Sequence, residues 1–494
     1  MNRVLTDPRL RVAACAAVLV VAALIAFLAA PPTADTAESG AADGGRAVVN
    51  RTALACPVLG SGGTVETVVT AASPVLPENT PTAAGNETPL TLSNLNPDSG
   101  KAFAAIRERN RLAVNTRSNA AAPLSLRGTG PLAAGAVATV TATATEGVNR
   151  GVAGAACVAP SSEFWFVGVN TTAGRRGVLT LTNLDEQNAG VDVVVHGAGG
   201  VREVPATRGV VVPARGQTDI YLNMAVPNQR DLALRVVATA GRVAASFRDN
   251  VAGKTTSGAG VDWVPPAAVP TKRLVVPAVA PGNGLRALTV VNPGDVQATA
   301  TVWIHGPNGR FKPARKETLD LAAGATRVIR LDDALLGAGG AVSIDSDQPL
   351  TGAVRMVDAK LTDFAAVGAT APLTGPAYLA LPPHPELLVL MLTAPDKAGA
   401  VLVEVRDAGG KVVQRRELDV AEGATSVVPI EPQTKANYLT VTPRKGGDLV
   451  AGVVLAPPTK GNPAVNKFAA WSLSTSLVFR AQLGAEPDVR AALR

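Results

Sequence analysis

The sequence predicts an all-β protein of tandem immunoglobulin-like or fibronectin-like β-sandwich domains, preceded by one N-terminal transmembrane helix. Three observations support this prediction. Similar segments recur at spacings of about 100 residues. Short runs rich in Val, Thr, Leu and Ile are separated by Gly, Pro, Asn and Asp, as strands are by turns. One long apolar run lies near the N-terminus, and helical periodicity is otherwise expected only at 98–114 and in the charged tail.

The apolar run at 12–30 follows Arg3, Arg9 and Arg11. At about 1.5 Å rise per residue it is long enough to cross a hydrocarbon core of about 30 Å as a helix. The arginines favour a cytoplasmic N-terminus, 1–11, and an extracytoplasmic remainder. One alternative stays open, a cleaved signal peptide, which would give a secreted protein. VAAC (12–15) resembles a lipobox, but no hydrophobic region precedes Cys15, so we interpret it as a helix residue.

Residues 31–48 are small and polar with Pro and Gly, which predicts a flexible stalk. Four β-domains and a short tail are expected beyond it. Their predicted bounds are 49–160 for a divergent N-terminal β-domain with a disulfide, 161–270, 271–374 and 375–480 for three β-sandwich repeats, and 481–494 for the C-terminal tail.

The repeats are visible as matched text. VLTLTNLDEQNAGVDVVVHGAGG (178–200) aligns with ALTVVNPGDVQATATVWIHGPNG (287–309) and with LVLMLTAPDKAGAVLVEVRDAGGKVV (388–413). The first copy contains seven or eight short apolar runs in about 100 residues, a density typical of immunoglobulin-like sandwiches. Three sets of positions recur between copies: His196, His305 and Arg406; Gly216, Gly324 and Gly423; and Trp263, Phe364 and Phe468.

The recurring histidines raise the question of metal or acid–base chemistry. On a strand the same face recurs every second residue, and the neighbours at those positions offer no further ligand. The third copy has Arg406 in the histidine position. We therefore interpret His196 and His305 as strand-end residues beside a hairpin, and His384, in a proline-rich link, as exposed or capping a turn.

The sequence also lacks several common catalytic and phosphate-binding motifs. There is no G-x-S-x-G nucleophile elbow, no G-x-x-x-x-G-K-[ST] phosphate loop and no cysteine beside a histidine. The pairs Asp332/Asp333 and Asp345/Asp347 leave open a calcium ion between domains. We predict no catalytic residue, no cofactor and no metal site.

The net charge of +7 and the pI near 9.5 favour anionic surfaces such as envelope polymers or lipid headgroups. No block of Lys and Arg is long enough for a nucleic-acid arm, and basic residues are not interleaved with aromatic ones. We therefore expect no nucleic-acid partner.

Cys56 and Cys157 would lie outside the membrane, in an oxidising compartment, and we predict a disulfide between them. The run EFWFVGV contains the densest aromatic group, Phe164, Trp165 and Phe166. These rings either pack in the core or form an exposed ligand platform, such as a glycan site, and the exposure of Trp165 distinguishes the two.

The segments ACVAPSSEFWFVGV (156–169) and LTLTNLDEQNAGVDVVVHGAGG (179–200) resemble an uncharacterised family of actinobacterial secreted or membrane-anchored proteins. The resemblance covers about residues 50–480. It implies association with the cell envelope and genes often near those of envelope glycosyltransferases, and it supplies no catalytic residue.

We therefore expect a non-enzymatic, membrane-anchored extracytoplasmic protein that acts as a binding or scaffold module, with an unknown envelope protein or glycan as partner. The alternative is a glycan-binding or carbohydrate-active accessory protein of the envelope. Because rigid sandwiches commonly present function on loops, 248–262 and 455–468 are candidate contact loops.

Overall fold

The computed structural model describes residues 46–60, 64–83, 85–86, 88–96, 102–120, 122–252, 258–360, 362–384, 386–455 and 468–481. Most of these residues lie in β-strands and few lie in helices, which confirms the predicted all-β class. No helix in these ranges is long and apolar enough to span a membrane. The predicted segments 1–11 and 12–30, most of the stalk and residues 482–494 lie outside the described residues.

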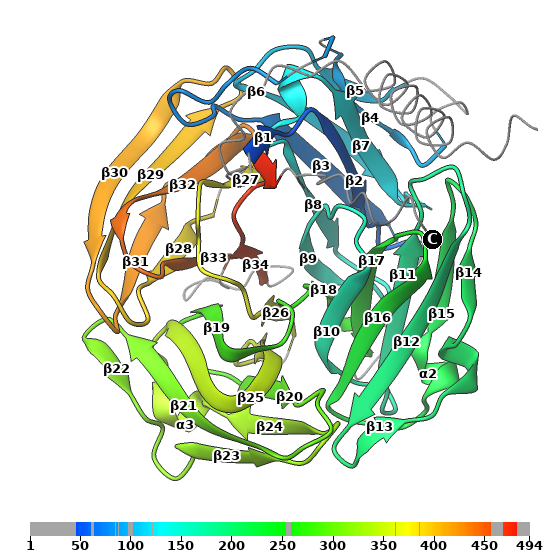
Figure 1. Ribbon diagram of the computed structural model, residues 1–494, viewed down its shortest axis with the longest axis vertical. Helices are drawn as coiled ribbons and strands as arrows, with labels where there is room; N and C mark the ends of the chain where they lie inside the picture. Colours follow the sequence, from blue (N-terminus) through cyan, green and yellow to red (C-terminus); the bar gives the residue numbers. More distant parts are fainter. Residues whose placement is uncertain are drawn as a thin grey trace, which may run out of the picture. The chain divides into compact units, whose positions relative to one another are not determined.

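The chain divides into two units, Val48–Phe479 and the two ends beyond it. Within Val48–Phe479 the strands form four modules, each with two antiparallel sheets (Figure 1). Because this stretch is a single compact unit, the predicted boundaries of separate domains stay a prediction.

Module 1 contains the sheets β2-β7-β4-β5 and β6-β3-β8-β9. Its elements are β2 (Arg51–Cys56), β3 (Val65–Ser73), β4 (Leu90–Asn94), β5 (Ala104–Ile106), β6 (Arg111–Ser118), β7 (Leu124–Thr129), η2 (Pro131–Ala133), β8 (Val137–Ala144) and β9 (Gly151–Ala156). The helix expected over 98–114 is wrong, because its described part forms β5, a turn and the start of β6. Tertiary pairing of β6 with β3 overrides the local helical pattern.

Module 2 contains the sheets β10-β16-β12-β13, with β14 also on β12, and β15-β11-β17-β18. Its elements are β10 (Glu163–Val169), β11 (Arg175–Thr182), β12 (Ala189–Gly197), β13 (Gly200–Arg202), η3 (Pro205–Thr207), β14 (Val210–Val212), β15 (Gln217–Tyr221), α2 (Leu222–Ala225), β16 (Leu232–Ala240), β17 (Ala244–Ala252) and β18 (Gly258–Val264). Much of the predicted contact loop 248–262 is therefore strand.

Module 3 repeats this order, but one strand serves both sheets: β25 pairs with β19 and β21 through its first part and with β20 and β26 through its second. Its elements are β19 (Thr271–Val279), β20 (Arg286–Val291), β21 (Ala298–Gly306), β22 (Gly309–Phe311), β23 (Thr318–Leu321), β24 (Thr326–Arg330), α3 (Asp332–Leu335), β25 (Gly340–Val357) and β26 (Phe364–Gly368).

Module 4 contains the sheets β27-β32-β29-β30 and β31-β28-β33-β34. Its strands are β27 (Ala377–Leu381), β28 (Leu388–Thr393), β29 (Gly399–Asp407), β30 (Val412–Val420), β31 (Thr425–Ile430), β32 (Asn437–Gly446), β33 (Val450–Leu455) and β34 (Ala469–Leu473). Most of the other predicted contact loop, 455–468, lies outside the described residues.

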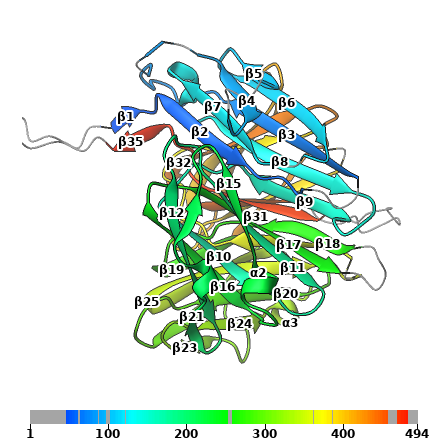
Figure 2. The same ribbon diagram turned by 90° about the vertical axis from the view of Figure 1, so that its right-hand side faces the viewer.

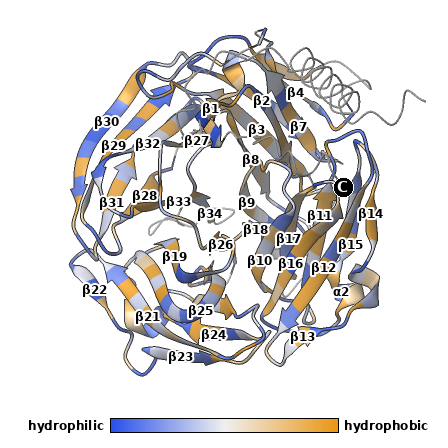
Figure 3. Cartoon of the chain, viewed as in Figure 1, coloured by the Kyte–Doolittle hydropathy of each residue, from blue (hydrophilic) through white to orange (hydrophobic). Residues whose placement is uncertain are grey.

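Each module is held together by its own apolar core between its two sheets. The period of two along a strand places side chains alternately toward this core and away from it. In β21, for example, Ala298, Ala300, Val302 and Ile304 are buried in the core of module 3. Figure 3 shows this alternation as bands of hydrophobic and hydrophilic colour along β21 and β29.

The modules also pack on one another. The first strand of one module contacts the second sheet of the next: β10 contacts β20 and β25, β19 contacts β28 and β33, and β27 contacts β3 and β8. The last strands of the modules, β9, β18, β26 and β34, contact each other in a closed cycle. We name the four junctions 1–2, 2–3, 3–4 and 4–1 after the modules that they join.

The two ends of this unit meet. The backbone N–H of Val49 donates to the carbonyl oxygen of Val478 at 2.9 Å. Just beyond, β1 (Arg46–Val48) pairs with β35 (Phe479–Ala481) in a two-stranded sheet, which Figure 2 shows side by side. Residues 46–48, expected as the end of a flexible stalk, are therefore a strand.

Candidate functional site

The two recurrent histidines lie at junctions between modules. Each is the penultimate residue of its strand, β12 or β21, and a tight hairpin follows. Nδ1 of His196 lies 2.9 Å from the carbonyl oxygen of Gly324 in module 3. Nδ1 of His305 lies 3.0 Å from the carbonyl oxygen of Gly423 in module 4, and its Nε2 lies 2.8 Å from Oγ of Ser343. The histidines thus bond module 2 to module 3 and module 3 to module 4.

Burial lowers the pKa of both rings, only partly opposed by the hydrogen bond that each makes to a glycine carbonyl. The neutral imidazole that results can donate from Nδ1 to the carbonyl oxygen. No group of three or more His, Cys, Asp and Glu in the described ranges is arranged to hold a metal ion. The residue arrangement therefore gives both histidines a packing role.

The acceptor glycines occupy one turn, which recurs in all four modules just before β6, β15, β24 or β31. One residue of this turn has a positive φ, and its N–H donates, at 2.6 to 3.0 Å, to a carbonyl oxygen at the end of the module's second strand or within three residues after it. These residues are Asn110, Arg215, Gly324 and Gly423. The predicted register with Gly216 is therefore wrong by one residue, because Arg215 takes the left-handed conformation in module 2. Asn110 was missed because its surrounding sequence has diverged, although Asn is a residue type that tolerates this conformation.

Junction 4–1 is built from other residues. Arg406, in the histidine position of module 4, bonds within its own module, to Glu404 Oε2 at 2.9 Å and to the Gly410 carbonyl oxygen at 3.2 Å. From module 1, Nδ2 of Asn110 donates to the Gly410 carbonyl oxygen at 3.1 Å, and Nη1 of Arg111 donates to that of Gly409 at 2.6 Å. The same turn therefore donates here, whereas it accepts at junctions 2–3 and 3–4.

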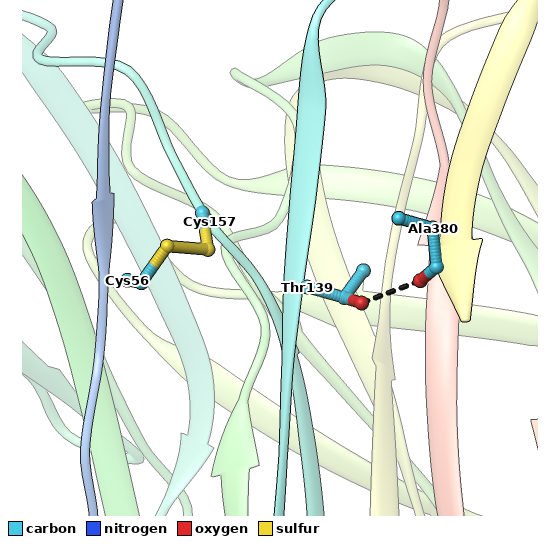
Figure 4. The surroundings of a disulfide bond; sticks show 4 residues. All are labelled: Cys56, Thr139, Cys157 and Ala380. Atoms are coloured by element: carbon cyan, nitrogen blue, oxygen red, sulfur yellow. Dashed lines mark hydrogen bonds between the residues drawn. A yellow bond between two sulfur atoms is a disulfide. The ribbon is translucent and has the colours of Figure 1, made fainter. Parts of the chain in front are cut away.

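Cys56 and Cys157 form the predicted disulfide, which joins β2 to the segment after β9 within module 1 (Figure 4). On the other face of that module, Oγ1 of Thr139 on β8 donates to the carbonyl oxygen of Ala380 on β27 (Figure 4). The disulfide thus closes module 1 internally, while β8 bonds this module to module 4.

The aromatic run of β10 is largely enclosed. Trp165 is 1% exposed and Phe166 0%, and Phe164 is half-buried. The Trp165 ring packs with Val291 and Ala353 of module 3, and its Nε1 donates to Oε1 of Glu163 at 2.9 Å. An exposed ligand platform does not fit these positions, because Trp165 fills junction 2–3 while Phe164 and Phe166 pack on the core of module 2.

Of the four carboxyl groups considered for calcium, three pair with cations, and Asp347 accepts from the N–H of Thr299 at 2.9 Å. Arg330 Nε lies 2.8 Å from Asp332, and Lys316 Nζ lies 2.7 Å from Asp333. Arg273 lies 3.4 Å from Asp345. His384 is buried, with its Nε2 3.1 Å from the Asn437 amide, so the expected exposure is wrong. Its Nδ1 lies 3.3 Å from the carbonyl oxygen of Glu386, two residues along the chain, as in the alternative of a turn cap.

A pocket of about 330 Å³ lies where the last strands of the four modules meet. All four modules supply lining residues, among them Ala156, Trp263, Ala371 and Trp471. The lining is mostly Ala, Pro and Val with a few hydroxyl groups, and the two tryptophan rings form buried parts of its wall. We call this the central pocket. Trp263 belongs to the aromatic position that repeats in the sequence, but Trp471 does not, and the meeting of the four strands could not be predicted from the sequence.

Buried carboxyl groups hold these last strands together. Asp262 directly precedes Trp263 on β18, and its Oδ1 accepts from the N–H of Gly154 on β9 at 2.9 Å. Asp363, before β26, accepts from the N–H groups of Val152 at 3.4 Å and Phe468 at 3.2 Å. Burial raises the pKa of both carboxyl groups well above the usual range. Their contacts are backbone groups of neighbouring modules, which fits a structural role.

A second pocket, of about 300 Å³, lies at junction 2–3, and we call it the junction pocket. Its polar lining comes from module 2 and module 3 and comprises Asn170, Arg175, Asp231, Thr289 and Arg355. Arg175 and Arg355 both bond to Asp249, which is 0% exposed. Reading the sequence alone missed this group, because its members lie on separate strands of two modules and form no local motif.

Comparisons with known proteins give little more than a family. No curated protein matches the chain. A solved structure, the alpha-L-rhamnosidase of Streptomyces avermitilis complexed with L-rhamnose, aligns at 9% identity and a TM-score of 0.11, over 84% of this chain and 58% of that enzyme. The chain therefore spans under two thirds of that enzyme's length, and the likeness is too weak to bear on fold or function.

A family model described as "Family of unknown function (DUF5719)" matches residues 113–431. This match includes the strands that carry His196 and His305 and all of modules 2 and 3. The expected actinobacterial source and gene neighbourhood stay predictions. Because the match covers more than half of the 494 residues, the chain belongs to the DUF5719 family of unknown function.

Proposed function

We propose that this chain is a non-enzymatic binding or scaffold protein of the cell envelope. In this proposal residues 12–30 anchor it in the membrane, the N-terminus is cytoplasmic and the modules are extracytoplasmic, with secretion after signal cleavage as the alternative. The Cys56–Cys157 disulfide supports an oxidising compartment. The arginines before the apolar run support the orientation.

The modules themselves we propose to be immunoglobulin-like or fibronectin-like sandwiches. Two antiparallel sheets over one core, joined by connections that cross between the sheets, support this relation. The strand order, with β10 beside β16 and β15 beside β11, departs from the order of antibody domains. The relation is therefore one of architecture.

The central pocket is the observation that carries the binding role. A ligand in it would contact all four modules at once, whereas the repeated polar residues are occupied by bonds between modules. Pockets lined mainly by apolar groups with a few polar ones are the usual form of ligand sites. We therefore propose that an apolar group of an envelope component occupies the central pocket.

A photo-cross-linking amino acid at position 156 tests this proposal. Ala156 is exposed and lines the central pocket, and Ala240 is an exposed alanine at the end of β16. In membranes that contain the full chain, we expect a discrete adduct from position 156 and none from the matched control at position 240. We also expect Ala371→Trp, which fills the pocket from module 3, to abolish the adduct. Equal adducts from both positions, or an adduct that survives Ala371→Trp, would contradict the proposal.

A second candidate function is a glycan-binding or carbohydrate-active accessory protein of the envelope. The junction pocket favours it, because amide, hydroxyl, carboxyl and guanidinium groups converge there. Such groups are the ones that bind the hydroxyl groups of a sugar.

A further inference from the structure

The junction pocket contains an excess of positive charge. Nη1 of Arg355, on β25, donates to Oδ2 of Asp249 at 2.8 Å, and Nε of Arg175, on β11, donates to Oδ1 at 3.1 Å. Nη2 of Arg175 bonds to the same carboxylate. Two guanidinium groups, each with a side chain about 13–14% exposed, thus share a single buried carboxylate.

The other carboxyl groups near this pair do not restore the balance. Asp262 and Asp363 are 0% exposed, and burial raises the pKa of each well above its usual range, which favours the neutral acid. Burial also raises the pKa of Asp231. In the same surroundings burial, followed by the repulsion of Arg175, lowers the pKa of Arg355 to about 10. A bound anion would relieve the cost of these cations.

Both arginines retain hydrogen-bond donors toward the pocket. A guanidinium has five N–H groups. Among the described residues, the Arg355 side chain donates only from Nη1, and the Arg175 side chain only from Nε and Nη2. The Phe364 ring lies 3.6 Å from the Arg355 guanidinium carbon and fixes its plane. Such planar donors match the oxygens of a carboxylate or phosphate group.

The rest of the lining indicates what surrounds the anion. Asp231 and Asn170 line the pocket from module 2, and Thr289 lines it from module 3. A carboxyl oxygen in the wall opposes a bare anion but accepts from a hydroxyl group. The lining thus fits a ligand that has hydroxyl groups beside its anionic group.

We propose that the junction pocket binds an anionic sugar, with the carboxylate or phosphate on Arg175 and Arg355 and a hydroxyl group on Asp231. This inference rests on the proposal that the chain is a binding protein. It concerns a different pocket from the central one, so the cross-linking result and the result below can fail independently.

Calorimetric titration of the full chain with small probes tests the ligand class. We expect saturable binding of glucuronate, of glucose 6-phosphate or of both, and none of glucose at the same concentration. The two acids distinguish a carboxylate source from a phosphate source. Binding of inorganic phosphate as tight as that of glucose 6-phosphate would overturn the role of the hydroxyl groups. Failure of every acid to bind at millimolar concentration would overturn the proposal.

Matched variants test the residues. Arg175→Gln removes one donor group, and we expect it to weaken the binding of the preferred acid by about tenfold or more. Arg176→Gln makes the same change at the neighbouring exposed position, and we expect no effect. Equal effects of the two variants would contradict the site.

If Arg175→Gln does not fold, Asp231→Asn provides the test, because Asn also tolerates the positive φ of this position, 55°. The Asn amide offers N–H donors to an anion where the carboxyl group offers acceptor oxygens, so this variant should strengthen the binding of inorganic phosphate and reduce the preference for glucose 6-phosphate over it. An unchanged preference would overturn the proposal.

Discussion

Junctions 2–3 and 3–4 differ from junction 4–1 in which module supplies the hydrogen bond. At the first two, a buried histidine at a strand end bonds to a glycine carbonyl in the turn of the next module. At junction 4–1 the same turn, now at Asn110, donates a side-chain hydrogen bond back to Gly410 of module 4. Arg406, in the histidine position, bonds inside its own module.

At all three junctions the strand end of one module contacts the turn of the next, but the residues that form the hydrogen bond differ. At junctions 2–3, 3–4 and 4–1 the first strand of one module packs on the second sheet of the next module. This packing brings the same two segments together at each junction. Which side donates is then decided by single residues. Repeat positions in the sequence therefore locate the contacts, but they do not determine the bonds.

The disulfide gives the largest expected effect and distinguishes module 1 from the others. It closes a sequence separation of 101 residues. In the chain-entropy model such a loop contributes about 4–5 kcal/mol to the free energy of unfolding. We expect reduction to lower the denaturant midpoint accordingly, and Cys56 and Cys157 to react with a thiol label only after reduction. Labelling of either cysteine in the native, unreduced protein would contradict the bond.

Substitution of His305 and of His196 by alanine compares the stability that each histidine contributes at junctions 3–4 and 2–3. His305→Ala removes bonds to Gly423 and Ser343 and leaves a buried hydroxyl group beside a cavity, so we expect a loss of about 2–4 kcal/mol in unfolding free energy. Nε2 of His196 is buried with no partner among the described residues, so His196→Ala should cost less, about 1–3 kcal/mol. Denaturant titration of both variants checks the order, and the reverse order would contradict these roles.

The histidines also predict a pH dependence. Burial lowers the pKa of His196, His305 and His384 in the folded protein below the ordinary value of 6.5. The unfolded chain therefore takes up protons first as the pH falls below 6.5, and stability is lost from there downward. Asp262 acts in the opposite sense, because its raised pKa makes the folded state lose stability as the pH rises above the usual carboxyl range.

Denaturation of wild type and His305→Ala between pH 7.5 and pH 5 isolates the histidine contribution. We expect the difference in unfolding free energy between the two proteins to shrink as the pH falls, since the variant lacks one proton-binding group of the unfolded state. A constant difference across this range would show that His305 has no lowered pKa.

Much of the strand pattern and one disulfide could be predicted from the sequence, because alternation and cysteine count are local or compositional signals. The recurrence of His196 and His305 located their strand ends, but their acceptors lie in the next module. The aromatic run of β10 allowed two interpretations, a core position or an exposed ligand platform. Only the packing of Trp165 against module 3 distinguishes them. The junction pocket needs Arg175 and Arg355 from two modules, and no spacing in the sequence joins them.

Asn110 and Arg215 supply the smallest expected effects, because they occupy the same turn of modules 1 and 2, with φ values of 63° and 49°. Glycine adopts this conformation without strain, so substitution by glycine isolates the side chain. Asn110→Gly removes the bond to Gly410 and the acceptor of the Tyr438 hydroxyl group, and we expect a loss of about 1 kcal/mol.

Arg215→Gly serves as the matched change. Its side chain bonds to the exposed Glu186, a pair of little value to stability, while the substitution relieves a left-handed arginine. We therefore expect a neutral effect or a gain of up to about 1 kcal/mol. Denaturant midpoints that fall equally for both variants would mean that the turn, and not the side chain of Asn110, determines the stability of junction 4–1.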